Sequence, residues 1–104
     1  MLSAKVGSIG DNRLGGWYAY RASKAALNML IKTASIELAR SKPRARLLSL
    51  HPGTVISPLS QPFRGAAAAR PAELAAAQML QVIDRLGPEH SGNFHAYDGQ
   101  PLPW

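Results

Sequence analysis

A tyrosine and a lysine four residues apart are the side chains of this sequence best placed to do chemistry. If Tyr20 and Lys24 lie on a helix, this spacing puts both side chains on one face. A phenol is a poor acid at neutral pH, but a cation one helical turn away favours its phenolate form. Tyr20 is therefore a candidate general acid/base. The alternative is an ordinary contact on a helix surface, because a Tyr-x-x-x-Lys match alone is weakly specific.

The segment around this pair predicts one long amphipathic helix over residues 18 to 40. Its apolar positions recur at intervals of three and four: Leu27, Leu30, Ile31, Ala34 and Leu38. Gly15 and Gly16 precede the segment and Pro43 follows it, so helix breakers stand near both ends. The Tyr20/Lys24 pair is thus expected near the N-terminus of a helix.

Further elements are indicated on the C-terminal side. The apolar run 47–50 indicates a short strand, residues 71–86 a second helix that covers a sheet, and residues 93–97 a final strand. Pro52 fixes its own φ and favours an extended His51, while Gly53 can adopt conformations closed to other residues and lets the backbone approach a ligand. The alternative for Pro52-Gly53 is simply a strand that ends in a turn.

These segments resemble the short-chain dehydrogenase/reductase family, in particular its C-factor-like branch. The resemblance is carried by residues 15–28 (GGWYAYRASKAALN), 50–55 (LHPGTV), 6–12 (VGSIGDN) and the ending 91–104. It implies an α/β fold, the C-terminal part of a Rossmann-like doubly wound parallel sheet with two to three strands and two main helices. The resemblance divides this single partial domain into a catalytic loop 1–17, an active-site helix 18–40, a strand and Pro-Gly turn 46–57, a lid-like loop 58–70, a helix 71–86, and a final strand with tail 92–104.

The family mechanism implies a role for each matching residue. Tyr20 would protonate the carbonyl oxygen of a small substrate, or act in reverse on an alcohol, and Lys24 would lower the pKa of the phenol and bind the nicotinamide ribose. The cofactor would be NAD or NADP. Backbone groups at and after Pro52-Gly53 would hold the nicotinamide carboxamide; by position these include Val55 and Ser57, and Ser57 stands where many members have threonine.

Two departures from the family pattern stand out. The family's Ser-x-x-Gly is matched here by Ala4-Lys5-Val6-Gly7, so the expected serine is an alanine. Ser3 is the preferred substitute and Ser8 a second one, while the alternative for each is a strand-end or turn residue. The sequence also has no Gly-rich turn of the pyrophosphate-binding kind; its glycines at 7, 10, 15 and 16 predict a flexible active-site loop. We therefore expect a C-terminal part of a dehydrogenase that does not turn over substrate alone.

Composition bears on the remaining function classes. The net charge of +6 raises a nucleic-acid rival, and residues 40–46 are its densest basic stretch. However, no aromatic residues alternate with these charges, and cations are favourable at a helix C-terminus, so a solvated loop is the preferred interpretation and no nucleic acid is expected. The chain has no cysteine and its three histidines lack a zinc pattern, so no metal is expected. No run is long enough to span a membrane, and we expect a cytoplasmic protein.

Self-association is the last expectation. The few strands indicated here would leave sheet edges and apolar helix faces uncovered, which predicts marginal stability or oligomer formation. In the resembled family the active-site helix often packs against a partner subunit, so a homo-oligomer formed through the helix 18–40 is expected. A noncatalytic remnant that only associates remains the alternative function.

Overall fold

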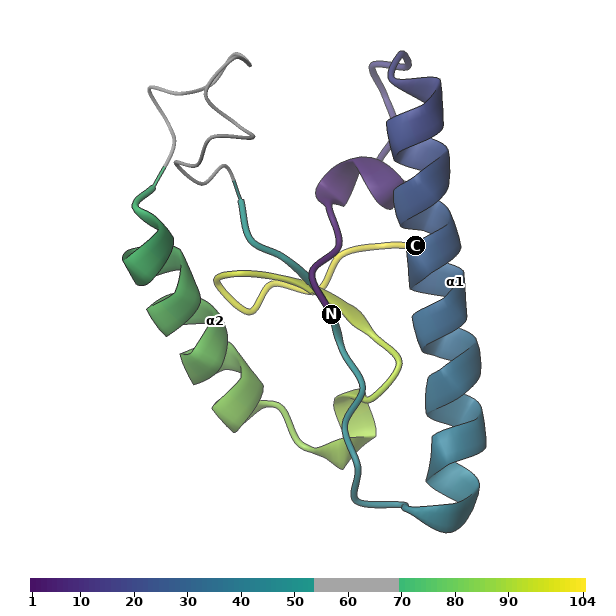
Figure 1. The fold of residues 1–104 in the computed structure, drawn as a ribbon, viewed down its shortest axis with the longest axis vertical. Helices are drawn as coiled ribbons and strands as arrows, with labels where there is room; N and C mark the ends of the chain where they lie inside the picture. The colour runs from purple at the N-terminus through teal and green to yellow at the C-terminus, as the bar shows by residue number, and fades with distance from the viewer. Residues whose placement is uncertain (54–69) are drawn as a thin grey trace.

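The structure, a computed structural model, describes residues 1–53 and 70–104, and places a helix on each side of a small group of parallel strands (Figure 1). The elements in chain order are η1 (Lys5–Gly7), α1 (Tyr18–Ser41), β1 (Ser49–His51), α2 (Ala72–Arg85), η3 (Pro88–His90) and β2 (Phe94–Ala96). The two helices lie close to the ranges 18–40 and 71–86 expected from the apolar periodicity. The 3-10 helix η1 falls in the expected loop 1–17, and η3 lies between the expected helix 71–86 and the final strand and tail 92–104.

The strands form a parallel arrangement centred on β1. β2 pairs with β1 in parallel, with Leu50 opposite His95, and Leu2 forms a parallel bridge to the other edge of Leu50. The C-terminal tail returns to β2 through an antiparallel bridge between His95 and Pro101. Leu50 is 3% exposed and Phe94 1%, as expected for parallel strands covered on both faces. The predicted fold class, part of a Rossmann-like α/β sheet, is confirmed.

The buried face of α1 is more polar than the apolar periodicity indicated. Its buried residues are Asn28, Ile31 and Ser35. Leu30, which belongs to the apolar series, is 66% exposed and lies on the outer side with Met29 and Ile36. The helix is therefore turned about its axis so that a stripe centred on Asn28 and Ile31 meets the strands. Local periodicity identified the helix but not the face that becomes buried.

The second helix, α2, covers the opposite side of the strands (Figure 1) and buries Ala75 and Val82. Arg46, which precedes β1, donates from Nη1 to the carbonyl oxygens of Ile83 at 2.6 Å and Leu86 at 2.7 Å. These carbonyls belong to the end of α2, where cations and donors are favourable. Part of the basic stretch thus binds the C-terminus of the other helix rather than solvent alone. Among the described residues no helix is long and apolar enough to cross a membrane.

The segment between residue 4 and α1 packs closely against the first turns of that helix. A Cβ atom added to Gly7 would lie 2.7 Å from the Cβ of Lys24 and 2.9 Å from its carbonyl carbon. Only a residue without a side chain permits this approach. The glycine at position 7 therefore joins η1 to the part of α1 that carries Lys24.

Replacement of Gly7 by alanine is expected to destabilise the protein by about 1–3 kcal/mol, because the added methyl group forces η1 away from helix backbone that cannot move aside. Urea denaturation followed by circular dichroism measures this change. Gly10→Ala is the matched control, since its Cβ would lie 3.2 Å from the Pro103 side chain and not against backbone. Equal losses of stability in the two variants would contradict the proposed contact.

Candidate functional site

The carboxyl ends of the parallel strands meet at one edge of the sheet, and the candidate site residues lie there. The chain leaves Leu2 into η1 and leaves His51 into Pro52-Gly53, and the N-terminus of α1 is at the same end of the molecule (Figure 1). In open α/β sheets this edge is where ligands bind. The parallel pairing therefore brings together segments separated by about half of the chain.

Tyr20 and Lys24 lie on the first two turns of α1. The side chain of Tyr20 is 47% exposed, and its ring centroid is 6.1 Å from that of Trp17. Lys24 is half-buried and its Nζ donates to the carbonyl oxygen of Leu2 at 3.4 Å, which uses one of the three donors of the ammonium group. The lysine is thereby held at the carboxyl end of the Leu2 segment. An exposed phenol and a cation thus lie one turn apart on the same side of α1.

A buried amide anchors this face of α1 to two strand segments. Ser3 Oγ and Ser49 Oγ each donate to Asn28 Oδ1 at 2.6 Å, and all three residues are buried. Asn28 follows Lys24 by four residues and Tyr20 by eight, so the three side chains share one side of the helix. In the sequence, Asn28 stands out only as a polar residue on the face that also carries Ile31.

The two serines considered as substitutes for the missing family serine are both engaged inside the fold. Ser3 donates to Asn28, as described above. Ser8 Oγ donates to the carbonyl oxygens of Pro103 and Trp104 and is 2% exposed. The structure thus brings Ser3 beneath the Tyr20/Lys24 face, but with its hydroxyl turned into the core. A catalytic role for Ser3 stays a prediction.

His51 ends β1 with its side chain bonded to the backbone of η1. Its Nδ1 accepts from the backbone N–H of Lys5 at 3.1 Å, so this strand-end histidine is satisfied by backbone. Burial is the main cause that lowers the pKa of the imidazole below its ordinary 6.5, and the cations of Lys5 and Arg70 act in the same direction against Asp11 and Asp98. A neutral ring is required, because Nδ1 accepts only when it is unprotonated.

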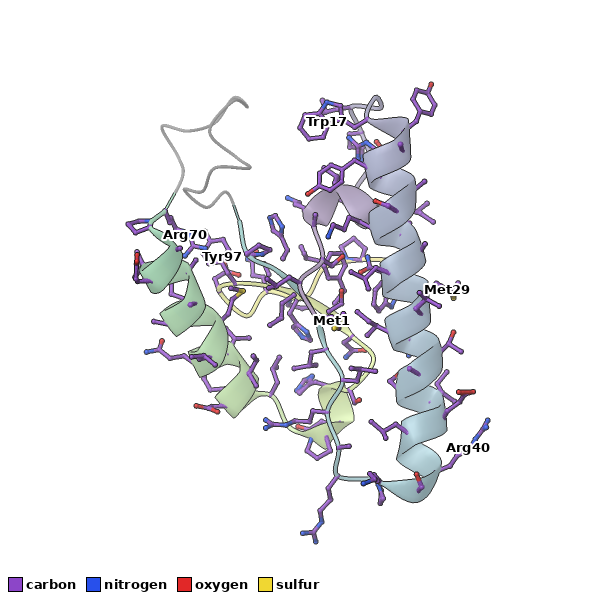
Figure 2. All side chains as sticks on the ribbon, in the orientation of Figure 1. Met1, Trp17, Met29, Arg40, Arg70 and Tyr97 are labelled. Atoms are coloured by element: carbon purple, nitrogen blue, oxygen red, sulfur yellow. The ribbon has the colours of Figure 1, made fainter. Side chains whose placement is uncertain are left out.

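The Pro-Gly turn is held from the side of α2. Gly53 has a φ of +75°, which favours glycine, and a Cβ there would lie 2.9 Å from the ring of Tyr97. Arg70 Nη2 donates to the carbonyl oxygen of Pro52, and its guanidinium lies 3.6 Å from the Tyr97 ring centroid. Figure 2 shows Arg70 and Tyr97 side by side near the start of α2. The structure thus places Pro52 and Gly53 at the site.

Some residues expected at this site are not described by the structure, and others were not expected. Val55 and Ser57 lie outside the described residues, as does most of the loop 58–70. In the described ranges, no three histidine or acidic side chains gather so that they can hold a metal ion. Arg21, Arg70 and Asn28 were not identified from the sequence, because no local pattern shows that their side chains bond Val6, Pro52 and Ser3, respectively.

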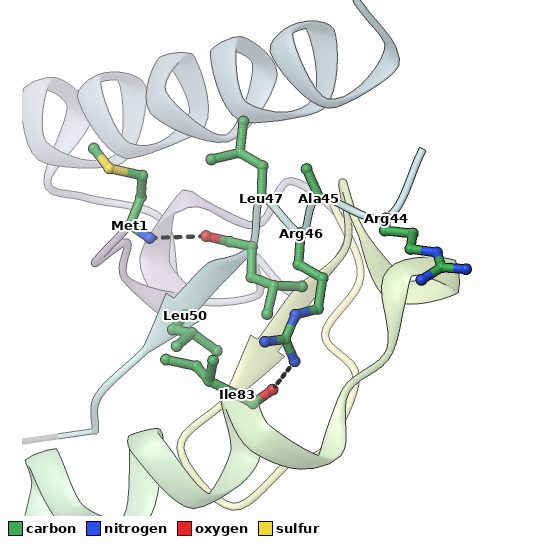
Figure 3. Close-up of a pocket in the computed structure, with 8 residues that line it drawn as sticks. Met1, Arg44, Ala45, Arg46, Leu47, Leu50 and Ile83 are labelled. Atoms are coloured by element: carbon green, nitrogen blue, oxygen red, sulfur yellow. Dashed lines mark hydrogen bonds between the residues drawn. The ribbon is translucent and has the colours of Figure 1, made fainter. Parts of the chain in front are cut away.

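Of two cavities in the described part of the chain, the larger one lies away from Tyr20. Figure 3 shows this groove of about 440 Å³, lined by Met1, residues 44–48, Leu50 and Ile83 at the amino end of β1. Arg46 crosses it to reach the Ile83 carbonyl. A second hollow of about 380 Å³ lies beside the start of α1, lined by Lys5, Val6, Asp11, Arg13, Leu14 and Arg21. Only the second hollow lies at the same end of the molecule as the candidate site.

Comparison with known proteins shows relatives along the whole sequence. The chain is 43% identical over 104 residues to 1-hydroxy-2-glutathionyl-2-methyl-3-butene dehydrogenase of Rhodococcus sp. (strain AD45), covering 100% of this chain and 45% of that protein. It is 44% identical over 103 residues to C-signal of Myxococcus xanthus, covering 99% of this chain and 58% of that protein. The chain therefore spans about half the length of these relatives. No protein-family model matches it.

Solved structures of similar fold include carbonyl reductases. Carbonyl reductase Sniffer of D. melanogaster superposes with a TM-score of 0.86 at 39% identity, covering 99% of this chain and 39% of that one. The NADPH-bound carbonyl reductase from chicken fatty liver gives a TM-score of 0.85 at 30% identity, covering 99% and 41%. The arrangement of α1, η1 and the parallel strands is thus shared with oxidoreductases of known structure.

The free energy of unfolding is expected to fall as the pH is lowered from about 7 to 5, because the unfolded chain binds protons on His51 that the folded chain does not. The contribution of His51 is present above pH 6.5 and is lost as the pH falls through its lowered folded pKa. His51→Asn keeps an acceptor near Nδ1 without titrating, so its stability should depend less on pH. Chemical denaturation at several pH values measures both slopes.

Part of the slope should survive in this variant, because burial also lowers the pKa of His95. At pH 8 the variant and the unmodified protein should have similar stability, since both provide an acceptor for the Lys5 N–H. An unchanged pH slope in His51→Asn would contradict the role given to this imidazole.

Proposed function

We propose that this chain, a member of the short-chain dehydrogenase/reductase family by homology along its whole length, carries the proton-transfer and nicotinamide side of an NAD(P)-dependent oxidoreductase. Its 44% sequence identity to C-signal agrees with the C-factor-like branch expected from the sequence. The reaction is reduction of a small carbonyl compound or oxidation of the corresponding alcohol. The observation that carries the proposal is the exposed Tyr20 phenol one turn from Lys24, at the carboxyl ends of parallel strands.

In this proposal Tyr20 moves the proton. Its hydroxyl donates to the substrate oxygen as that oxygen gains negative charge, and receives the proton in the reverse direction. The Lys24 cation stabilises the resulting phenolate, and its donors not used by Leu2 are available to a ribose hydroxyl. Ser3 would assist only if its hydroxyl turned away from Asn28, which would leave Ser49 as the donor to that amide.

The turn after β1 is the proposed contact for the nicotinamide end of the cofactor. Gly53 supplies the left-handed backbone of this turn, and the Tyr97 ring and Arg70 fill the space that a side chain would take there and hold the turn from the side of α2. Pro52, Gly53, Val55 and Ser57 are the proposed contacts to the carboxamide, and NAD or NADP is the proposed cofactor. The nicotinamide, when bound, supplies the hydride; the residues of this chain supply orientation and the proton.

The enzyme in this proposal is longer than the 104-residue chain. The chain covers 45% and 58% of the lengths of the two relatives above, and it contains no Gly-x-Gly-x-x-Gly motif that could bind a pyrophosphate. We therefore propose that the 104 residues alone neither bind a nicotinamide cofactor at micromolar concentration nor turn over substrate. The cytoplasm is the proposed location. The nucleic-acid rival loses support, because Arg46 is bonded to the end of α2.

Tyr20→Phe is expected to reduce turnover by about 10²–10⁴-fold, because the variant keeps the ring but loses the proton-transferring hydroxyl. The measurement is carbonyl-dependent loss of NADPH or NADH absorbance by the chain joined behind a matching dinucleotide-binding half. The affinity of this joined protein for cofactor should change little. Turnover by Tyr20→Phe close to that of the unmodified protein would rule out the assigned role.

Ser3→Ala in the same joined protein distinguishes a structural role of Ser3 from a catalytic one. Loss of a buried donor to Asn28 alone costs about 1 kcal/mol of stability and leaves turnover nearly intact. A catalytic hydroxyl would instead show a large fall in turnover with folding preserved. The 104-residue chain without the added half should show no turnover and no heat of cofactor binding.

A second candidate function, association through α1, rests on its outer face. Met29 and Leu30 are each 66% exposed and Ile36 is 50% exposed, so the helix presents apolar surface away from the strands. This face fits the expected homo-oligomer, which is compatible with either an enzyme or a noncatalytic remnant.

Leu30→Lys is expected to shift the protein from dimer toward monomer in sedimentation velocity experiments, because it places a charge on the apolar outer face of α1. Gln81→Lys, on the exposed side of α2, adds the same charge elsewhere and should leave the sedimentation coefficient unchanged. A compact monomer at all concentrations before mutation would contradict association through this helix.

A further inference from the structure

The tail that follows β2, residues 100–104, turns back along that strand and ends against the loop 8–17, which joins η1 to α1. The backbone N–H of Ala96 donates to the carbonyl oxygen of Gln100 at 2.8 Å, and the N–H of Leu102 donates to that of Phe94 at 2.8 Å. These two bonds flank the antiparallel bridge described above. In Figure 1 the yellow tail runs from β2 towards α1. The tail is therefore bonded to the sheet before it reaches the loop.

The last two residues of the tail hold the first part of this loop. Ser8 Oγ donates to the carbonyl oxygen of Pro103, and the backbone N–H groups of Ile9 and Gly10 both donate to that of Trp104, at 2.5 and 3.1 Å. A Cβ atom on Gly10 would lie 3.2 Å from the Pro103 side chain, so the two segments also touch sterically. Ser8 is 2% exposed, which shields its hydroxyl from water. Three successive loop residues are thus bonded to the tail.

The ring of Trp104 anchors the end of the tail. Its centroid lies 5.5 Å from that of Phe94, with 19° between the planes, so the two rings are stacked. Phe94 is 1% exposed and is the first residue of β2, which fixes its position in the core. Trp104 is 37% exposed and covers Phe94 from the outside. A substitution of the indole therefore removes the anchor and leaves the core residues in place.

The loop held by the tail forms part of the wall of the second hollow. It leads into Asp11, Arg13 and Leu14, which line this hollow of about 380 Å³ beside the start of α1. Arg21 fixes the two ends of the stretch, because its guanidinium donates to the carbonyl oxygens of residues 6 and 16 at 3.3 and 2.9 Å. Glycine at positions 7, 10, 15 and 16 gives the backbone wide conformational freedom. The contact with the tail restricts that freedom between the two ends.

We propose that Trp104 is a positioning residue that acts through the tail on the loop 8–17. Stacking on Phe94 keeps the carbonyl oxygens of residues 103 and 104 where the loop can donate to them. The ordered loop then supplies a fixed wall at the Tyr20 end of the molecule, and so raises the affinity for a small carbonyl substrate. Trp104 itself touches neither substrate nor cofactor. The step from loop to substrate rests on the proposed function, whereas the coupling between tail and loop does not.

Native-state hydrogen exchange of the ¹⁵N-labelled chain, followed by NMR, tests the coupling. Ile9 is 79% exposed, so its amide and that of Gly10 should be protected mainly by their bonds to Trp104. Trp104→Ala should make both amides exchange about 10-fold faster, because the stacked anchor is lost. Trp104→Phe keeps a ring that can stack and should stay within about 3-fold of the unmodified chain. The amide of Ile31 in the middle of α1 should not be affected.

Two further variants separate this coupling from a general loss of stability. Gln100→Ala changes an exposed side chain of the same tail and should leave the exchange of Ile9 and Gly10 unchanged. Ser8→Ala removes the donor to Pro103 from the loop side and should accelerate both amides as Trp104→Ala does. It also decides the question if Trp104→Ala does not fold.

The joined protein tests the step to the substrate, with diacetyl as the carbonyl compound. Trp104→Ala should raise the KM for diacetyl about 10-fold and leave the KM for the cofactor within about 2-fold, because the loop is a wall of the substrate space. Trp104→Phe should restore the KM. A merely structural role would lower the amount of folded enzyme, and hence the rate, without changing the KM for diacetyl.

The proposal is overturned if Ile9 and Gly10 are unprotected in the unmodified chain, or if they exchange equally fast in the unmodified chain and in Trp104→Ala. Equal acceleration of the α1 amides, or an unchanged KM for diacetyl, also contradicts it. Failure of the proposed function is separate: it shows as full turnover in Tyr20→Phe or as no turnover by the joined protein. The exchange rates still decide the coupling between tail and loop in that case.

Discussion

The buried side chain of Asn28 is the contact on which the arrangement of this protein depends. One carbonyl oxygen accepts hydroxyl groups from Ser3, next to the Leu2 bridge, and from Ser49 at the start of β1. A buried acceptor left unpaired costs free energy, so the two hydroxyl contacts to Asn28 Oδ1 favour a narrow range of geometry. It sets the rotation of α1 about its own axis, and Lys24 and Tyr20 are carried with it toward the carboxyl ends of the strands. The Asn28 Nδ2 atom has no partner among the described residues.

The segment before α1 is then placed by two contacts on the same helix. Gly7 lies against the backbone of Lys24, and Arg21 binds the carbonyl oxygens on both sides of the loop. Neither contact is hydrophobic. Gly7 fits sterically against the helix backbone, and Arg21 donates hydrogen bonds to carbonyl oxygens of the loop. Together they explain how a loop rich in glycine and with little apolar burial can hold the Trp17 backbone in a left-handed conformation. A glycine-rich loop is thus given an ordered shape by its neighbours.

Several positive charges of this basic chain have structural roles. Arg46 supplies donors to the last carbonyls of α2, Arg70 binds Pro52 and lies over Tyr97, and Arg21 holds the Gly15-Gly16 turn. Each guanidinium offers five donors in a fixed plane, which suits the joining of carbonyl groups from different segments. The net charge of +6 therefore reflects internal cross-linking by arginine as well as surface composition. This weakens the argument from charge to a nucleic-acid partner.

The sequence by itself determined what depends on neighbours in the chain: the approximate positions of both helices, strands near 47–50 and 93–97, which the structure has at 49–51 and 94–96, and the shared face of Tyr20 and Lys24. These follow from helical and extended geometry, which local spacing sets. Only the tertiary structure decided that Asn28 faces inward and Leu30 outward, that the Ser3 hydroxyl points to Asn28, and that Trp17 is left-handed. Each of these depends on a partner segment whose position no local pattern encodes, because burial and donor satisfaction are properties of the packed whole.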